Sequence, residues 1–369
     1  MNQPSTVDEA VAAIADLRTE GVPVYPTGTG SRPDWGGPDP QPTAALSTLG
    51  LGHIVEHNAG DFTAVLEAGL PLAEAQAAFA AEGQWLAVDP AEPGGTIGGL
   101  FATADSGPAR HRYGGPRDLI IGATVVLSDG TVASSGGRVI KNVAGYDLGK
   151  LLTGSRGTLG LLASVAVRLH PLPARTATVR IGTNDPDALG RTVVALARKP
   201  IEALSLDAWW RGDEGGVLVR LGGAAAEEQA KRVAVLLDQP ATTVTDDKAI
   251  WAEQRAGQRD RDGGVVLKVS GRITDLPMVV RCAREHGASV VSRAGLGLSW
   301  LRFPDSESLV EHVEAVRAAL APRHCLALDG AARVPNPGLA DPVVRALTER
   351  VKARFDPHGL FRPGAFGGL

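Results

Sequence analysis

The chain contains only two cysteines among 369 residues, Cys282 and Cys325. They lie in unrelated contexts, and neither belongs to a Cys-x-x-Cys pair. The sequence therefore does not support a disulfide framework, a structural zinc or an iron–sulfur cluster, and any cluster would have to belong to a partner. None of the eight histidines shows a metal-ligand spacing with another candidate ligand, so we expect no metal site.

Long apolar runs are also absent. No stretch provides 18 uncharged apolar residues, and the first 21 residues carry scattered charges without an apolar core and cleavage site. We therefore expect a cytoplasmic chain without a transmembrane segment, which reaches the inner face of a membrane only through partners. The net charge of -4 gives no electrostatic reason to bind nucleic acid or anionic lipid.

Glycine, in contrast, is abundant, with 46 residues that are concentrated in the first 160 positions. Glycine allows a backbone to turn sharply or to approach another group closely, so this region is where we expect a ligand. A chain of 369 residues with 44% hydrophobic and 21% charged residues is long enough for at least two globular domains.

Local patterns predict an α/β beginning. Thr6 and Glu9 have the spacing of a capping box before a helix over 7–20, and a short strand over 22–25 should follow. Apolar runs at 119–127 and 131–134 flank an Asp-Gly connection, which predicts a hairpin. An alternating strand near 164–170 then ends in prolines, and we place the end of the first domain at residue 173.

In the second part of the chain, one order of strands and helices occurs twice. Strands alternate with helices near 186–198 and 225–238, and a similar series has helices near 275–286 and 306–320. The pattern predicts an α+β domain over 174–335, built from two related half-sheets. A final helix and a patterned tail, within 336–369, should return to the first domain.

Two glycine loops each leave a strand or enter a helix, at 26–31 and 94–99. Backbone N–H groups in such loops can converge on phosphate oxygens, although either loop alone is equally compatible with an ordinary tight turn. The first loop lacks the third glycine of the dinucleotide fingerprint, and no G-x-x-x-x-G-K-[ST] occurs in the chain. A nicotinamide Rossmann domain and a P-loop enzyme are therefore disfavoured.

These loops, together with Gly137 to Leu148 and Gly154 to Leu162, resemble the FAD-binding domain of the vanillyl-alcohol-oxidase-like (PCMH-type) flavoproteins. The resemblance covers roughly residues 5–173. It implies an α+β fold: a PCMH-type FAD-binding domain of two subdomains, then an α+β cap domain with ferredoxin-like half-sheets. It also implies FAD as the cofactor.

In this family the first loop embraces the pyrophosphate, the second lies against pyrophosphate and flavin, and the third segment lines the adenosine end. Carried onto this sequence, the resemblance implies an FAD site of Pro26, Thr27, Gly28, Thr29, Gly30, Ser31, Gly94, Gly95, Thr96, Ile97, Gly98, Gly99, Thr103, Ser106, Gly107, Lys141, Asn142, Gly145, Tyr146, Asp147, Gly157, Gly160 and Leu162. Lys141 could neutralise a phosphate or be an exposed lysine without a role. Tyr146 and Asp147 could contact FAD or only cap and pack the next helix.

The run Lys-Asn-Val-Ala-Gly-Tyr-Asp is similar to that of the FAD-binding E subunits of glycolate oxidases. Catalytic relatives carry a Gly-His-Ala-Gly-Asp-Gly-Asn-x-His-like motif in the cap domain. The best match here is residues 292–300, where Arg293 and Trp300 stand in the places of the histidines, and the tail has Arg362 where asparagine is usual. Arg293 or Arg362 could clamp a small carboxylate, or both could be structural.

Three functions fit this sequence. The first is the FAD-binding subunit of a glycolate oxidase, working beside a catalytic flavoprotein subunit and an iron–sulfur subunit. The second is a self-sufficient FAD-dependent dehydrogenase of a small 2-hydroxy acid, and the third is a flavin-binding scaffold without a redox role. The absence of the motif histidines and of cluster-binding cysteines favours the first function, a subunit that works beside partners.

Overall fold

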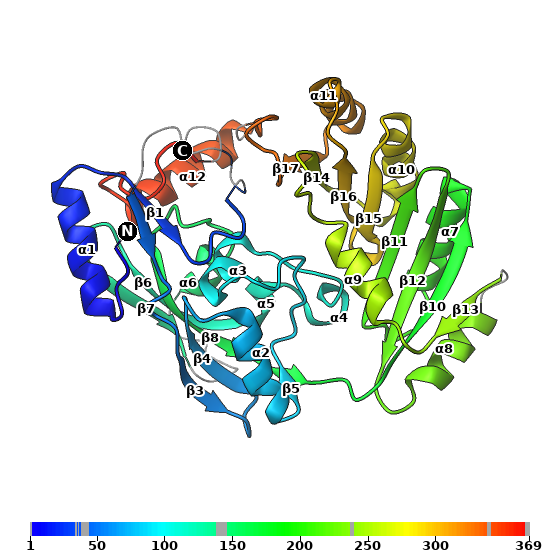
Figure 1. Cartoon of the computed structure of the whole chain (residues 1–369), viewed down its shortest axis with the longest axis horizontal. Helices are drawn as coiled ribbons and strands as arrows, with labels where there is room; N and C mark the ends of the chain where they lie inside the picture. Colours follow the sequence, from blue (N-terminus) through cyan, green and yellow to red (C-terminus); the bar gives the residue numbers. More distant parts are fainter. Residues whose placement is uncertain are drawn as a thin grey trace.

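The structure is a computed structural model that describes residues 2–33, 35, 37, 44–137, 146–236, 240–337 and 341–365. Two α+β units lie side by side, and both chain ends belong to the first of them (Figure 1). The predicted fold class is confirmed.

The smallest part of the first unit is a helix against a pair of parallel strands. Helix α1 (Val7–Thr19) begins at its predicted cap, because Thr6 Oγ1 accepts a hydrogen bond from the Glu9 N–H at 3.1 Å. Strands β1 (Val24–Thr27) and β2 (Ala44–Ser47) pair in parallel. Strand β1 begins two residues later than predicted, because Pro23 has no backbone N–H to donate. The first donor of the strand is the Val24 N–H, which bonds the Leu360 carbonyl oxygen.

The larger part is a five-stranded antiparallel sheet, in the order β3-β4-β8-β6-β7. Its strands are β3 (Ile54–Asn58), β4 (Thr63–Glu67), β6 (Ile120–Val126), β7 (Val132–Gly136) and β8 (Leu161–Arg168). The predicted hairpin is β6–β7, with Gly130 at φ 88° in its turn. The remaining elements are α2 (Leu72–Ala81), β5 (Gln84–Trp85), α3 (Ile97–Thr103), α4 (Arg110–Tyr113), α5 (Pro116–Leu119), α6 (Leu148–Leu152) and β9 (His170–Pro171). Phe79 and Phe101 are fully buried between the helices and this sheet.

The second unit, which we call the cap, has one eight-stranded sheet in the order β13-β10-β12-β11-β15-β16-β14-β17. The first half comprises β10 (Thr176–Thr183), α7 (Pro186–Ala197), β11 (Ser205–Arg211), β12 (Glu214–Gly222), α8 (Ala226–Val235) and β13 (Thr242–Val244). The second comprises β14 (Val265–Ser270), α10 (Leu276–Glu285), β15 (Ser289–Arg293), β16 (Leu298–Phe303), α11 (Leu309–Leu320) and β17 (His324–Ala327). Each half follows the order strand, helix, strand, strand, helix, strand, and the halves join where β11 pairs with β15. The predicted half-sheets are confirmed.

The two faces of the cap sheet have different neighbours. Helices α7, α8, α10 and α11 cover one face, and helix α9 (Lys248–Ala256) lies on the other, toward the first unit (Figure 1). Trp210 and Trp251 are fully buried and Trp209 is 9% exposed. These tryptophans fill the two packed faces of the sheet and do not form an exposed aromatic surface.

The chain passes to the cap between β9 and β10 and comes back at its end. Helix α12 (Pro342–Phe355) is followed by a tail whose Phe361 forms a parallel bridge with Val24. The Lys352 ammonium links this tail to the first unit. Its Nζ donates hydrogen bonds to the carbonyl oxygens of Thr158 and Phe361 at 2.7 and 2.6 Å. We keep 1–173, 174–335 and 336–369 as the proposed division of the chain.

Candidate functional site

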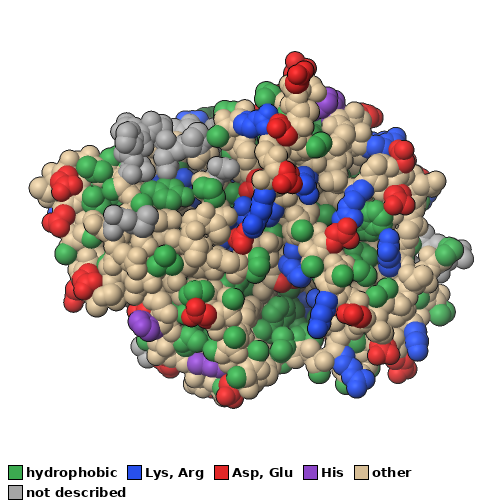
Figure 2. Space-filling model, viewed as in Figure 1, with side chains coloured by type: hydrophobic (Ala, Val, Ile, Leu, Met, Phe, Trp, Pro, Cys, Tyr) green, Lys and Arg blue, Asp and Glu red, His purple; other side chains and the backbone are tan. Residues whose placement is uncertain are grey.

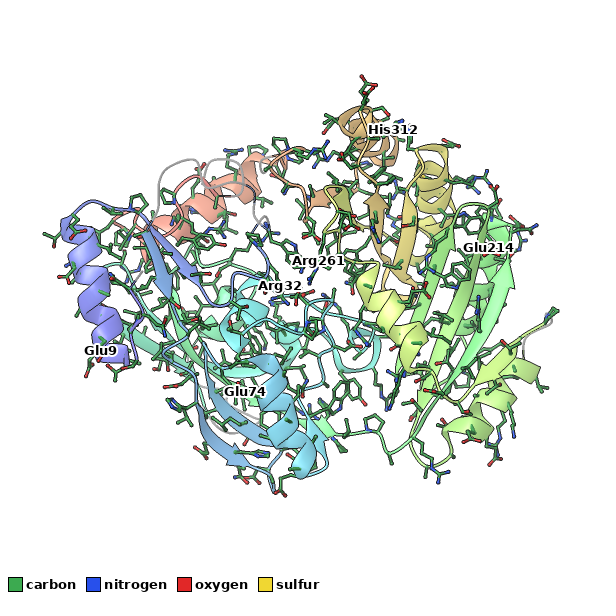
Figure 3. All side chains as sticks on the ribbon, viewed as in Figure 1. Glu9, Arg32, Glu74, Glu214, Arg261 and His312 are labelled. Atoms are coloured by element: carbon green, nitrogen blue, oxygen red, sulfur yellow. The ribbon has the colours of Figure 1, made fainter. Side chains whose placement is uncertain are left out.

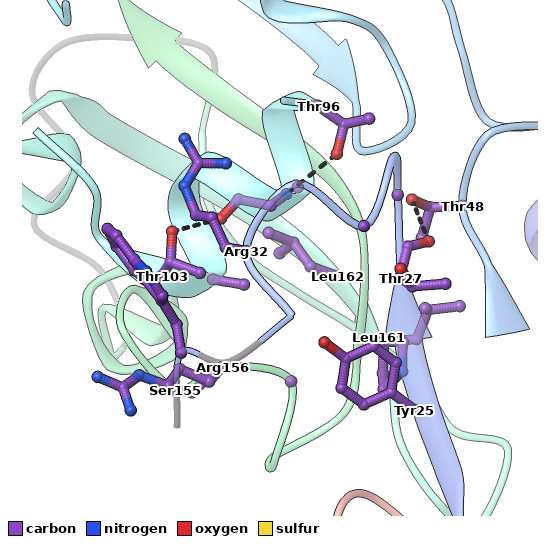
Figure 4. A pocket seen from close by; sticks show the side chains of 18 of the residues that line it. Tyr25, Thr27, Arg32, Thr48, Thr96, Thr103, Ser155, Arg156, Leu161 and Leu162 are labelled. Carbon is purple, nitrogen blue, oxygen red and sulfur yellow. Dashed lines mark hydrogen bonds between the residues drawn. The ribbon is translucent and has the colours of Figure 1, made fainter. Parts of the chain in front are cut away.

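A cleft opens where the loop after β1, helix α3, the turn before β8 and the C-terminal tail meet. In Figure 4, Thr96 and Thr103 lie on one side of it, and Tyr25 and Leu161 lie on the other. The cleft is lined by Tyr25, Pro26, Thr27, Gly28, Thr29, Gly30, Ser31, Arg32, Trp35, Thr48, Thr96, Gly98, Gly99, Ala102, Thr103, Leu152, Ser155, Arg156, Gly157, Gly160, Leu161, Leu162 and Arg362.

The first two glycine loops touch each other at the cleft. A Cβ atom on Gly28 would lie 2.3 Å from Thr96 Oγ1, so a larger residue does not fit. Thr29 Oγ1 donates a hydrogen bond of 3.1 Å to the Gly94 carbonyl oxygen. Gly30 has φ 66°, which favours glycine. The two loops therefore form one continuous wall of backbone.

The segment from Gly154 to Leu162 lies next to α3 and forms another wall of the cleft. The Gly154 and Arg156 N–H groups donate to the carbonyl oxygens of Phe101 and Ala102 at 3.0 and 2.8 Å. Gly157 and Gly160 have φ of 76° and 150°, and a Cβ on Gly157 would come within 3.2 Å of the Pro26 ring. Backbone from three distant segments thus approaches one space.

Two arginines add positive charge to this space. Burial, and secondly the charge of Arg362, lower the pKa of Arg156 to about 10, so the side chain remains protonated at neutral pH. The Arg362 guanidinium lies 4.5 Å from the centre of the Tyr25 ring. Exposed backbone, hydroxyl groups and two guanidinium groups are the donors that a phosphate-bearing cofactor requires. The residues present therefore fit FAD.

The structure brings most of the expected FAD residues together. The cleft wall contains Pro26, Thr27, Gly28, Thr29, Gly30, Ser31, Thr96, Gly98, Gly99, Thr103, Gly157, Gly160 and Leu162, and also Arg362. Gly94, Gly95, Ile97, Ser106, Gly107, Tyr146 and Asp147 lie outside that wall. Lys141, Asn142 and Gly145 lie outside the described residues.

Two of the residues outside the wall, Gly107 and Asp147, have structural roles. A Cβ on Gly107 would lie 1.7 Å from the Asp89 carbonyl oxygen, so this glycine is required by packing. Asp147 caps α6 by accepting a hydrogen bond from the Lys150 N–H, and Tyr146 is 90% exposed. For Tyr146 and Asp147, the structure agrees with the alternative in which they only cap and pack the next helix.

Sequence reasoning missed Arg32. Its Nε and Nη2 donate to Asp105 Oδ2 at 3.0 and 2.7 Å, and both side chains are almost fully buried. This pair ties the first glycine loop to the segment after α3. The one sequence signal was the position of Arg32 directly after that loop, since Asp105 is 73 residues away.

Arg293 does not lie open to a substrate. It is fully buried in the cap, where its Nη1 donates to Asp207 Oδ2 at 2.7 Å and its Nη2 donates to Gln258. The alternative in which Arg293 is structural therefore agrees with the geometry. His111 is a half-buried residue of α4 that lies against Gly295 of the cap.

Hydrogen bonds join the cap to the first glycine loop and the residues that follow it. Trp35 Nε1 donates to Asp329 Oδ1 at 3.0 Å, and Arg259 bonds Asp329 Oδ2 at 2.7 Å and the Ser31 carbonyl at 3.2 Å. Arg261 pairs with Glu92, and Figure 3 shows Arg261 near Arg32 at this junction. In the space-filling view, several Lys and Arg side chains, with Asp and Glu side chains among them, lie along the boundary between the two units (Figure 2).

Comparison with known proteins agrees with this site. Residues 2–136 match the sequence model of a family described as FAD binding domain. The glycolate oxidase subunit GlcE of Escherichia coli (strain K12) is 27% identical over 84% of this chain and 83% of its own length. The glycolate oxidase subunit GlcD of Bacillus subtilis (strain 168) is 31% identical over 52% of this chain and 41% of its own length.

Other similar proteins are D-lactate dehydrogenases, of which this chain spans less than half the length. An alkyldihydroxyacetonephosphate synthase has the same fold, with a TM-score of 0.73 over 98% of this chain and 76% of its own, at 14% identity. The FAD-binding domain and the FAD cofactor inferred from the sequence are thereby confirmed, and the chain is a relative of FAD-linked oxidoreductases that oxidise hydroxy acids. None of the described helices is long and apolar enough to cross a membrane.

Proposed function

We propose that this chain, whose residues 2–136 match an FAD-binding domain, is the FAD-binding subunit of a glycolate oxidase complex. The observation that carries the proposal is the match to the subunit GlcE, which extends over most of both chains and so includes the cap. The matches to GlcD and the D-lactate dehydrogenases cover about half of this chain or less.

The chemistry of the cap supports an accessory role. At the positions where catalytic relatives carry histidines, this chain has Arg293 and Trp300, and both are buried. Bound FAD supplies a two-electron acceptor, but abstraction of a hydroxyl proton needs a base close to the substrate. We therefore infer that a catalytic flavoprotein subunit performs the oxidation, and that an iron–sulfur subunit passes the electrons on.

One experiment separates the alternatives. The purified chain is reconstituted with FAD, and its visible spectrum is recorded before and after anaerobic addition of glycolate. We expect bound flavin that stays oxidised until the catalytic subunit is added. Absence of bound flavin would overturn the proposal.

The D-lactate dehydrogenases among the relatives favour a second candidate, a self-sufficient 2-hydroxy-acid dehydrogenase. For this candidate, glycolate or D-lactate would bleach the flavin of the isolated chain. Complex activity that is unaffected by replacing FAD with a redox-inactive analogue would instead indicate a scaffold.

A further inference from the structure

Residues 259–261 form a short segment of the cap between helix α9 and strand β14. The Arg259 side chain is fixed within the cap by Asp329, whose Oδ2 accepts a hydrogen bond of 2.7 Å from Arg259 Nε. The same oxygen accepts a hydrogen bond of 2.8 Å from the Asp260 N–H. Asp329 therefore holds both the segment and the base of the Arg259 guanidinium, and the two remaining guanidinium nitrogens reach the first unit.

One of these nitrogens bonds the first glycine loop. Arg259 Nη2 donates a hydrogen bond of 3.2 Å to the carbonyl oxygen of Ser31, which ends the loop and lines the cleft. The Arg259 guanidinium also lies 5.5 Å from the centre of the Trp35 ring, which lines the same cleft. The Arg259 side chain is only 10% exposed, so solvent screens these contacts weakly.

The same cap segment reaches the second glycine loop through Glu92. Glu92 Oε1 accepts a hydrogen bond of 3.1 Å from the Gly94 N–H. Glu92 Oε2 pairs with Arg261 and lies 3.6 Å from Arg259 Nη1. One segment of the cap is therefore connected to both glycine loops, near the place where Arg261 is labelled in Figure 3.

The charge of Glu92 bears on an anionic cofactor. A carboxylate two residues before the second glycine loop repels the phosphates of FAD unless cations neutralise it, and Glu92 is only 8% exposed. Arg32 bonds the Glu92 carbonyl oxygen, but its guanidinium is paired with Asp105. The described ion-pair partners of the Glu92 carboxylate, Arg259 and Arg261, both belong to the cap. A cap that moved away would leave this charge beside the cofactor loops.

We propose that Arg259 is a positioning residue of the FAD site, through which docking of the cap raises cofactor affinity. It holds the first glycine loop by the Ser31 carbonyl and, with Arg261, neutralises Glu92 next to the second. The inference rests on the proposed function, because it takes the cleft as the FAD site. Coupling between two binding events is reciprocal, so bound FAD also tightens the docking of the cap.

The first test measures the FAD dissociation constant of the full-length chain by flavin fluorescence. Arg259→Gln should weaken FAD binding about 10- to 100-fold, as for the loss of hydrogen bonds from a charged group. Glu202→Gln is the control, since Glu202 of the cap pairs with Arg112 of α4, outside both glycine loops. Glu202→Gln should leave the constant unchanged.

Arg261→Gln tests the charge on Glu92 with little risk to the fold, because the Arg261 side chain is 68% exposed. Solvent screens an exposed guanidinium, so the expected weakening of FAD binding is smaller, about 2- to 5-fold. Urea unfolding without FAD shows whether each variant is folded.

A double variant separates positioning from a general loss of packing. Glu92→Gln removes the carboxylate charge and keeps an oxygen that can accept the Gly94 N–H. Adding Glu92→Gln to Arg259→Gln should therefore recover part of the lost FAD affinity. If Arg259 only packed the two units together, the double variant would bind FAD as weakly as Arg259→Gln or more weakly.

Hydrogen exchange gives a readout from the side of the cap. The Asp260 N–H bonds Asp329, and the Gly264 N–H bonds Asp260 Oδ2. FAD should slow deuterium uptake in the peptide that contains residues 259–264, which lies outside the cleft wall. Arg259→Gln should abolish this slowing.

Three results would overturn the inference: an unchanged FAD dissociation constant in folded Arg259→Gln and Arg261→Gln, a double variant that recovers no affinity, or deuterium uptake in residues 259–264 that FAD leaves unchanged. Failure of the wild-type chain to bind FAD would instead refute the proposed function. The two failures are therefore distinguished by the wild-type titration.

Discussion

The Arg362 side chain reaches a residue 206 positions earlier, where its Nη1 donates a hydrogen bond of 3.0 Å to the Arg156 carbonyl oxygen. Both residues have a left-handed backbone, with φ of 46° and 54°. This conformation costs a non-glycine residue about 1–2 kcal/mol. Such strained conformations persist only where the surrounding structure enforces them, and here both residues line the same cleft.

We expect Arg362→Gln to weaken FAD binding about 10- to 100-fold, because a guanidinium near the phosphates contributes charge-assisted hydrogen bonds. The measurement is the dissociation constant from the change in flavin fluorescence. Arg168→Gln, at an exposed end of β8, serves as the control and should leave the constant unchanged. An unaltered constant in Arg362→Gln would place the phosphates elsewhere.

Gly28→Ala should lower both FAD affinity and stability. The new methyl group would lie 2.3 Å from Thr96 Oγ1, and such overpacking typically costs about 1–3 kcal/mol. Adding Thr96→Ala removes the nearest atoms and should recover part of the loss in urea unfolding. Gly182→Ala is the control, since it has ordinary φ and no atom within 4 Å of the new methyl group. Equal effects in the two glycine variants would refute the close contact.

Asp329→Ala should loosen the cap from the first unit. It removes the acceptor of Trp35 Nε1, Arg259 Nε and the Asp260 N–H. Leaving buried charged and polar donors unpaired costs about 3–5 kcal/mol, so we expect calorimetry to show a lower melting temperature and two separated transitions.

Asp305→Ala provides the comparison for Asp329→Ala. Asp305 pairs with Arg333 at an exposed position, so its loss should cost less than about 1 kcal/mol. A single transition at the wild-type temperature in Asp329→Ala would show that the junction does not couple the units.

Asp207→Asn should destabilise the cap by about 3–5 kcal/mol, because it leaves the fully buried Arg293 charge without its anion. The double variant Asp207→Leu with Arg293→Met should regain most of this stability in urea unfolding. A double variant no more stable than Asp207→Asn would show that the buried ion pair does not set this cost.

Much of the fold could be predicted because its signals are local. The Thr6 cap, the Asp129-Gly130 turn and the recurring strand and helix order of the cap depend on neighbours within a few residues or on periodicity. The glycine loops were equally visible, because glycine is required wherever a Cβ would collide, as at Gly28.

The charged residues of the site could not be predicted in this way. Arg32 pairs with a carboxylate 73 residues away, and Arg293 with one 86 residues away. A charged side chain has the same appearance in the sequence whether it is exposed, paired in a core or directed at a ligand. Its role depends on burial and on partners that only the folded chain brings near.

The sequence by itself therefore determined an FAD-binding domain with glycine-lined loops and a repeated α+β cap, since backbone conformation and periodicity are local properties. The tertiary structure decided that Arg156 and Arg362 meet at the cleft and that Arg293 is paired with Asp207 inside the cap. The physical reason is that electrostatic roles depend on distance and desolvation, which are created only when segments far apart in the chain pack together.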